Sequence, residues 1–173
     1  YIHLLDLNNL IVPTRMIWDG REINSYDTID IDLLNKHFVD YINYGGYPEI
    51  VLSKKMQDDI TQYVRHDIVD KVMLRDLPSL YGIKDIQELN RLFVYIVYHT
   101  GEEFSYDGLS QESGIRKEVL KKYIQYFEAA FLIKVVHKVN DNAKNLQRVT
   151  AFKIYLTNPS LRCALFSPLS ASD

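Results

Sequence analysis

The chain has 173 residues, of which 47% are hydrophobic and 25% are charged, so it can bury the core of one domain or of two small ones. It contains no run of about 18 apolar residues, which predicts that no segment spans a membrane. Its single cysteine cannot form an internal disulfide, and its N-terminus lacks the features of a secretory signal, so we expect a cytoplasmic protein. The first residue is Tyr1 rather than methionine, which favours a fragment of a longer protein.

The net charge of -3 hides an asymmetry along the chain. Residues 1–113 contain 10 Lys and Arg against 19 Asp and Glu, a balance of -9. Residues 114–153 contain 9 Lys and Arg against 3 Asp and Glu, a balance of +6. A clustered basic surface is typical of nucleic-acid binding, and it also suits docking to an acidic protein.

Residues 1–85 predict a helical region, of which residues 1–14 are interpreted as the end of a preceding domain, with a strand at residues 2–7. Residues 21–30 are polar and predict a loop. A helix follows over residues 31–42, capped by Thr28 or by Asp30. Its apolar residues recur at helical spacing and predict one buried face, formed by Leu34, Phe38, Tyr41 and Ile42.

The segment Gly45-Gly46-Tyr47-Pro48-Glu49 predicts a sharp turn. We favour a structural corner over a phosphate-binding loop here. The longest helical pattern covers residues 55–75, with an apolar face that includes Ile60, Val64 and Val69, and the segment Arg75-Asp76-Leu77-Pro78 is expected to end it.

Residues 86–156 predict a winged helix-turn-helix. An apolar helix over residues 86–98 is followed by a short helix over residues 105–113, which Gly114 ends, and Ile115 is the apolar residue of the turn. The next helix, residues 117–130, has the buried-face pattern Leu120, Tyr123, Ile124 and Phe127. Two β-branched runs, residues 132–138 and 149–156, predict strands joined by a polar wing at residues 140–145. Residues 157–173 predict a helix start and a frayed tail. The fold class is therefore mainly α with a small β wing.

The candidate nucleic-acid-binding residues are basic side chains on the exposed face of the 117–130 helix and on the wing: Arg116, Lys117, Lys121, Lys122, Lys144 and Arg148. Gln125 is the only amide on that helix, so any binding to DNA is expected to be weak and non-specific. Tyr123 and Phe127 are expected in the core, with Tyr126 facing outward.

No catalytic constellation is visible. The sequence lacks the GxxxxGK[ST] phosphate loop and the GxGxxG turn, and its five histidines form no metal-binding spacing. Cys163 lies in an apolar segment, which favours a buried structural thiol. Arg65-His66-Asp67 is interpreted as a solvated helix face. We therefore expect no enzyme activity, no metal and no cofactor in this chain.

Four short motifs, in order, resemble one family: the GGYPE turn, Arg75-Asp76 with the GIKD turn of residues 82–85, the segment 109–132, and the segment 153–162. Together they resemble the C-terminal domain of predicted bacterial and archaeal AAA-type ATPases, over about residues 36–166. The resemblance implies that ATP and magnesium belong to an upstream P-loop domain, and that a nuclease-like segment lies downstream. Neither is present here. Asn158 departs from the family, which usually has an acidic residue at this position.

Two functions stay open at this stage. In the first, the winged unit binds DNA; in the second, it is an interaction module that docks its own ATPase domain or an acidic partner. The observation that discriminates between them is whether the face with Lys117, Lys121 and Lys122 is open to solvent.

Overall fold

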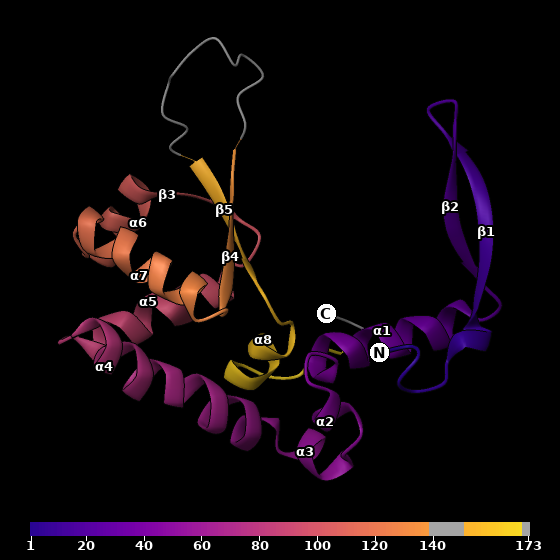
Figure 1. The fold of residues 1–173 in the computed structure, drawn as a ribbon, viewed down its shortest axis with the longest axis horizontal. Helices are drawn as coiled ribbons and strands as arrows, with labels where there is room; N and C mark the ends of the chain where they lie inside the picture. The colour runs from indigo at the N-terminus through magenta and orange to yellow at the C-terminus, as the bar shows by residue number, and fades with distance from the viewer. Residues whose placement is uncertain (139–150, 171–173) are drawn as a thin grey trace.

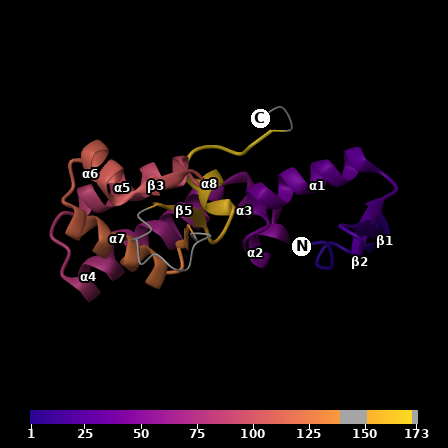
Figure 2. The ribbon, with the colours of Figure 1, turned by 90° about the horizontal axis from the view of Figure 1, so that it is seen from above.

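The computed structural model describes residues 1–138 and 151–170, in which helices predominate over two small antiparallel sheets. The molecule has two ends (Figures 1 and 2). At one end lies the N-terminal arm, residues 1–44, with strands β1 (Ile11–Trp18) and β2 (Arg21–Thr28) and helix α1 (Ile31–Tyr44). At the other end lies the C-terminal unit, which begins at residue 86, and a middle layer of helices connects the two.

The hairpin β1–β2 was not expected from the sequence. Trp18 pairs with Arg21 across a two-residue turn, in which Asp19 and Gly20 both have positive φ, 49° and 71°. That is the requirement of the tight turn whose twist matches two antiparallel strands. The predicted loop over residues 21–30 is therefore wrong, because most of it is β2. The predicted strand over residues 2–7 is also wrong; this segment forms turns that lead into a 3-10 turn, Asn8–Leu10.

Helix α1 confirms the predicted helix but not its buried face. Asp30, rather than Thr28, caps it, since its Oδ1 accepts a hydrogen bond from the Leu33 amide at 2.9 Å. Phe38 is 58% exposed and Tyr41 is 38% exposed, although the apolar spacing predicted both to be inward. The buried residue of α1 is Asn43, whose side-chain amide donates to the Leu169 carbonyl at 2.9 Å and accepts from the Leu169 amide at 2.8 Å.

The middle layer is a series of helical segments, interrupted at Ser53 and Asp59 and continuous from Ile60 to Tyr81, so the helix predicted over residues 55–75 is broken at Asp59. The segments are α2 (Pro48–Val51), α3 (Lys54–Asp58), two π-helical segments (Thr61–Asp70 and Val72–Asp76) and α4 (Leu77–Tyr81). Ile60, Val64 and Val69 are buried, as predicted. The predicted helix end at Pro78 is wrong. Pro78 lies in the first turn of α4, and the helical stretch ends at Gly82, which has the left-handed conformation.

The GGYPE turn packs against the start of α8 (Ser160–Leu165), far away in sequence. The Gly46 amide donates to Ser160 Oγ at 3.1 Å, and Asn158 Nδ2 donates to the Gly46 carbonyl at 3.0 Å. Asn158 Oδ1 also accepts from the Ser160 amide, so the asparagine caps the first turn of α8. A Cβ on Gly46 would collide with the Asn158 side chain. This geometry supports the structural interpretation of the turn, because the Gly46 amide already has an acceptor.

The C-terminal unit contains α5 (Ile86–Tyr98), β3 (Glu103–Ser105), α6 (Tyr106–Ser113), α7 (Lys117–Ala129), β4 (Ile133–His137) and β5 (Ala151–Leu156). The three helices match the predicted ranges to within one residue at each end. The antiparallel sheet has the order β3-β5-β4, and its short first strand was not predicted. Phe93, Phe127 and Phe152 are fully buried and form part of the core between helices and sheet. The predicted wing, residues 140–145, lies outside the described residues.

Candidate nucleic-acid interface

Helix α7 is held by its apolar face, which leaves the opposite face outward. Leu120, Tyr123, Ile124 and Phe127 are all buried, as their spacing predicted. The turn from α6 to α7 is fixed by Ile115, which is 4% exposed, and by two serines that hydrogen-bond its backbone. Ser110 Oγ donates to the Ile115 carbonyl at 2.6 Å, and Ser113 Oγ accepts from the Ile115 amide at 3.2 Å. The direction in which α7 presents its polar residues is therefore well determined.

Three of the four predicted basic residues on α7 are open to solvent. Arg116, Lys121 and Lys122 are exposed, and none of the ion pairs among the described residues includes them. Lys121 Nζ lies 5.5 Å from the centre of the Tyr106 ring, a distance suited to a cation–π contact. Lys117 differs: it is half-buried and forms an ion pair with Asp107 of α6. The remaining candidates, Lys144 and Arg148, lie outside the residues that the structure describes.

One further basic residue belongs to this end of the molecule. Lys153 is exposed on β5, in register with Val136 of β4 and Glu103 of β3. Its neighbours are already partnered, since Lys138 lies 3.8 Å from Glu103 and Lys134 lies 3.9 Å from Glu128. The charge of Lys153 is evident from the sequence, but its place in the sheet is not, because the pairing of β3 with β5 could not be predicted.

Tyr126 does not face outward as predicted. Its ring stacks on the ring of Tyr81 in α4, with centroids 3.8 Å apart and planes at 9°. One face of the ring is therefore covered, so Tyr126 is a poor platform for stacking a base. Tyr123 and Phe127 are in the core, as expected.

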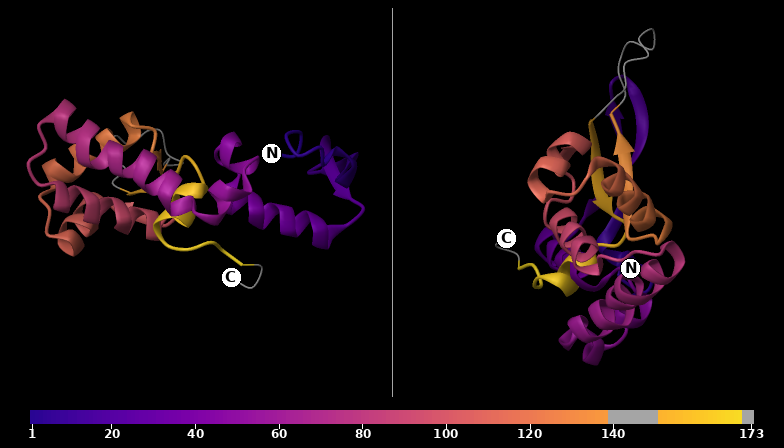
Figure 3. Two further views of the ribbon diagram at one scale, coloured as in Figure 1. Left: turned by 90° about the horizontal axis from the view of Figure 1, so that it is seen from below. Right: turned by 90° about the vertical axis from the view of Figure 1, so that its left-hand side faces the viewer.

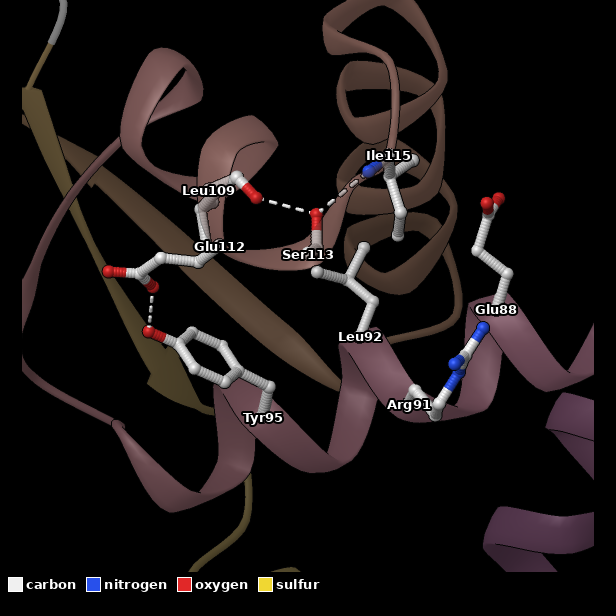
Figure 4. Close-up of a pocket in the computed structure, with 8 residues that line it drawn as sticks. All are labelled: Glu88, Arg91, Leu92, Tyr95, Leu109, Glu112, Ser113 and Ile115. Atoms are coloured by element: carbon white, nitrogen blue, oxygen red, sulfur yellow. Dashed lines mark hydrogen bonds between the residues drawn. The ribbon is translucent and has the colours of Figure 1, made fainter.

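A cavity of about 230 Å³ lies between α5 and α6 (Figure 4). Its lining combines the apolar residues Leu92, Leu109 and Ile115 with the polar or charged residues Glu88, Arg91, Tyr95, Glu112 and Ser113. The hydrogen bond that Tyr95 donates to Glu112 raises the pKa of Tyr95 to about 12. Burial, together with a hydrogen bond to Glu88, raises the pKa of Tyr123 to about 12. Ser113 donates to the Leu109 carbonyl, so its hydroxyl lacks a base that would activate it.

Cys163 is 3% exposed, and burial raises the pKa of its thiol to about 11. A protonated, enclosed thiol is a poor nucleophile and a poor metal ligand. Among the residues that the structure describes, no cluster of His, Cys, Asp and Glu has the arrangement needed to hold a metal ion. Within the same residues, no helix has the length and apolar character to cross a membrane.

The Arg65-His66-Asp67 segment lies on a solvated helix surface. His66 pairs with Asp70 at 2.8 Å, and Lys71 pairs with Asp67 at 3.1 Å. Both are pairs four residues apart along the same helical face, an arrangement that stabilises a helix surface. The geometry agrees with the interpretation of this segment as a solvated face.

The family of the chain follows from a match over most of its length. The family model described as Domain of unknown function (DUF8612) matches residues 35–172. The chain belongs to this family. The match begins within α1, so the hairpin β1–β2 lies outside it.

Two curated proteins are similar to the chain. An uncharacterized protein of Methanocaldococcus jannaschii is 25% identical over 126 residues, which are 70% of this chain and 28% of that protein. An uncharacterized protein of Haemophilus influenzae is 22% identical over 135 residues, which are 75% of this chain and 33% of that protein. The matched part is thus a third or less of the length of these relatives. No solved structure matches the chain significantly.

Proposed function

We propose that the C-terminal unit is a winged helix-turn-helix that binds duplex DNA weakly and without sequence choice. The order of its elements supports this proposal: a helix, a strand, two helices joined by a tight turn, and two further strands. The sheet order β3-β5-β4 also supports it, since the strand before α6 pairs with the last strand of the unit. In such a fold the second helix of the pair, here α7, approaches the major groove.

The observation that carries the proposal is the exposure of Arg116, which precedes α7, and of Lys121 and Lys122 on α7. Exposed cations bind phosphates and release the counterions that surround DNA, and this release drives salt-dependent association. Three phosphate contacts correspond to a slope of roughly -3 in a plot of log affinity against log salt. That slope predicts measurable binding at low salt and a steep loss as salt rises.

Two features of the same helix limit the affinity and the sequence choice. Gln125 is exposed and is the only amide on α7, so few hydrogen bonds to base edges are available. Glu118 is exposed near the basic residues and would repel a phosphate. DNA contacts would therefore be made mainly to the backbone, which positions a protein without reading sequence.

The test is a fluorescence-anisotropy titration with a short duplex and with a single strand, at low and at near-physiological salt. We expect the duplex to bind at low salt, and the double variant K121E/K122E to abolish binding. The matched control is K54E/K55E, which makes the same change of charge on α3, outside the C-terminal unit. Binding that survives K121E/K122E, or that K54E/K55E abolishes equally, would contradict the proposal.

A second candidate function, docking of a protein partner, is favoured by one residue. Phe131, two residues after the end of α7, is 82% exposed and has a φ of 56°. A bulky residue in the left-handed conformation is strained, and an exposed aromatic ring suits a protein interface. The partner could be the ATPase domain that the resemblance implies or an acidic protein. The ATPase domain, with its ATP and magnesium, stays a prediction. A complete absence of DNA binding at low salt would favour this second function.

A further inference from the structure

The N-terminal arm leaves large apolar side chains uncovered. In the hairpin, Ile17 is 78% exposed, Trp18 is 67% exposed and Tyr26 is 71% exposed. The hairpin packs mainly on itself and projects from the body of the molecule (Figures 1 and 3). An isolated two-stranded hairpin is only marginally stable in water, and it needs further strands or packing against a helix for independent stability. The geometry of the hairpin indicates how further strands can be added.

The two outer edges of the hairpin differ. In a hairpin with a two-residue turn, the two residues that flank the turn exchange backbone hydrogen bonds. Here these residues are Trp18 and Arg21, so every second residue along each strand from them also bonds to the other strand of the hairpin. The residues between them direct their backbone groups outward. On the β1 edge this outward set includes Pro13, which has no N–H to donate. On the β2 edge the outward set is Glu22, Asn24, Tyr26 and Thr28; the first three have both a donor and an acceptor, whereas the Thr28 N–H already donates to Asp27 Oδ1 at 2.8 Å.

The sequence of β2 is complementary to itself in one antiparallel register. If Asn24 lies opposite Asn24 of a second copy, Arg21 of each strand lies opposite Asp27 of the other. Two opposite-charge pairs then form, one on each side of the two-fold axis. Moving the register by one step in either direction places Arg21 opposite Ser25 or Ile29 and removes both pairs.

We propose that the free edge of β2 pairs with β2 of a second copy of this chain, joining the two hairpins into a four-stranded antiparallel sheet about a two-fold axis at Asn24. Arg21 and Asp27 share a face of the hairpin with Val12, Met16, Trp18 and Ile23. The apolar side chains of the two copies therefore lie on one continuous face. The interface is isologous, so it closes as a dimer and does not extend into a filament.

The pairing involves only one short strand from each copy, so the dimer is weak and depends on protein concentration. Sedimentation equilibrium over a range of concentrations measures its dissociation constant. Each single reversal, R21D or D27R, places like charges opposite each other twice, and we expect dissociation to become about tenfold easier. The double variant R21D/D27R restores opposite charges, and we expect its dissociation constant to return to within about threefold of the wild type.

A second pair of variants tests the edge itself. N24P removes an outward N–H at the two-fold axis, and we expect it to abolish the dimer. R15P places a proline directly across the hairpin, on the outer edge of β1, and should leave the dimer intact. Trp18 is the only tryptophan of the chain, so its fluorescence reports whether the hairpin stays folded in each variant. If a proline unfolds the hairpin, the charge-reversal series decides alone.

A protein that is monomeric at every accessible concentration overturns the proposal. A dimer whose dissociation constant is the same in R21D, D27R and R21D/D27R also overturns it, since the copies then meet elsewhere. The proposal is independent of the DNA-binding function. K121E/K122E should leave the dimer unchanged, and R21D should leave the salt dependence of DNA binding unchanged.

Discussion

Helices α1 and α7 have similar apolar patterns and opposite environments. In α7 the four residues of the apolar stripe are all buried, and the ring centroids of Phe127 and Phe93 lie 5.2 Å apart. In α1 the corresponding stripe includes Phe38, which is 58% exposed. The charges differ as well. The N-terminal arm contains 3 Lys and Arg against 7 Asp and Glu, whereas the outward face of α7 is basic.

The difference shows what helical periodicity measures. An apolar stripe predicts a face that must be covered, but it does not identify what covers it. In α7 the cover comes from α5, α6 and β4 of the same unit, so the prediction of burial is confirmed. In α1 Phe38 stays 58% exposed, and Tyr41 is covered only in part, by the ring of Tyr1 at a centroid distance of 5.6 Å, so the same inference is wrong for Phe38.

The largest expected effect contrasts these two helices directly. F127A deletes a fully buried ring and should lower the free energy of unfolding by about 3–5 kcal/mol. F38A removes a mostly exposed ring and should change it by less than about 1 kcal/mol. Urea denaturation, followed by circular dichroism, measures both.

The same two variants also test whether the apolar faces of α1 and α7 differ in solution. If F38A lowers the free energy of unfolding as much as F127A does, the apolar face of α1 is covered in solution. The concentration dependence of the F38A effect then identifies the cover: a difference that grows with protein concentration indicates a second copy. Equal effects at all concentrations would contradict our description of the arm as uncovered.

Much of the C-terminal unit could be predicted from the sequence because its signals are local. The left-handed Gly114 and the spacing of four apolar residues in α7 each depend on neighbours within one or two turns. The hairpin was missed although it also had a local signal. Asp19-Gly20 suits a two-residue hairpin turn, but the strand after it, Arg21–Thr28, is too polar to show clear alternation.

Non-local pairings could not be predicted. Gly46 meets Asn158 and Ser160 more than 100 residues away, and β3 pairs with β5 across the whole helix pair. Short motifs do not encode such partners. The candidate site was predicted in part for the same reason: the basic residues of α7 follow from helix geometry, whereas the Lys117–Asp107 pair and the place of Lys153 depend on the tertiary structure.

An intermediate effect is expected at the corner that joins the arm to the rest of the chain. G46A places a methyl group against the Asn158 side chain and should lower the free energy of unfolding by about 2 kcal/mol. The asparagine would have to leave its hydrogen bonds to the Gly46 carbonyl and the Ser160 amide. N158A removes those bonds and also relieves the collision.

The double variant G46A/N158A therefore tests whether residues 46 and 158 are in contact in solution. We expect its loss of stability, measured by urea denaturation, to be clearly smaller than the sum of the two single losses. Strictly additive losses would show that Gly46 and Asn158 do not touch in solution. The arm would then be less firmly joined to α8 than the structure shows.

The smallest expected effect concerns the electrostatics of the basic face. Asp107 pairs with Lys117, so one of the four basic residues at the start of α7 is partly neutralised within the chain. D107N removes the acid and keeps the shape of the side chain. If the C-terminal unit binds DNA, Lys117 becomes free to contact a phosphate, and affinity at low salt should rise about two- to threefold, with a slightly steeper salt dependence.

A matched control separates this local effect from the change in net charge. D32N removes one negative charge from the first turn of α1, in the arm, and should leave DNA affinity unchanged. Equal gains in both variants would mean that overall charge, rather than the α7 face, governs binding. No gain in D107N, while K121E/K122E still abolishes binding, would place Lys117 outside the interface and confine it to Lys121, Lys122 and their exposed neighbours. Anisotropy titrations of the three variants under one salt series are sufficient to decide, because a local contact changes the slope and a distant charge does not.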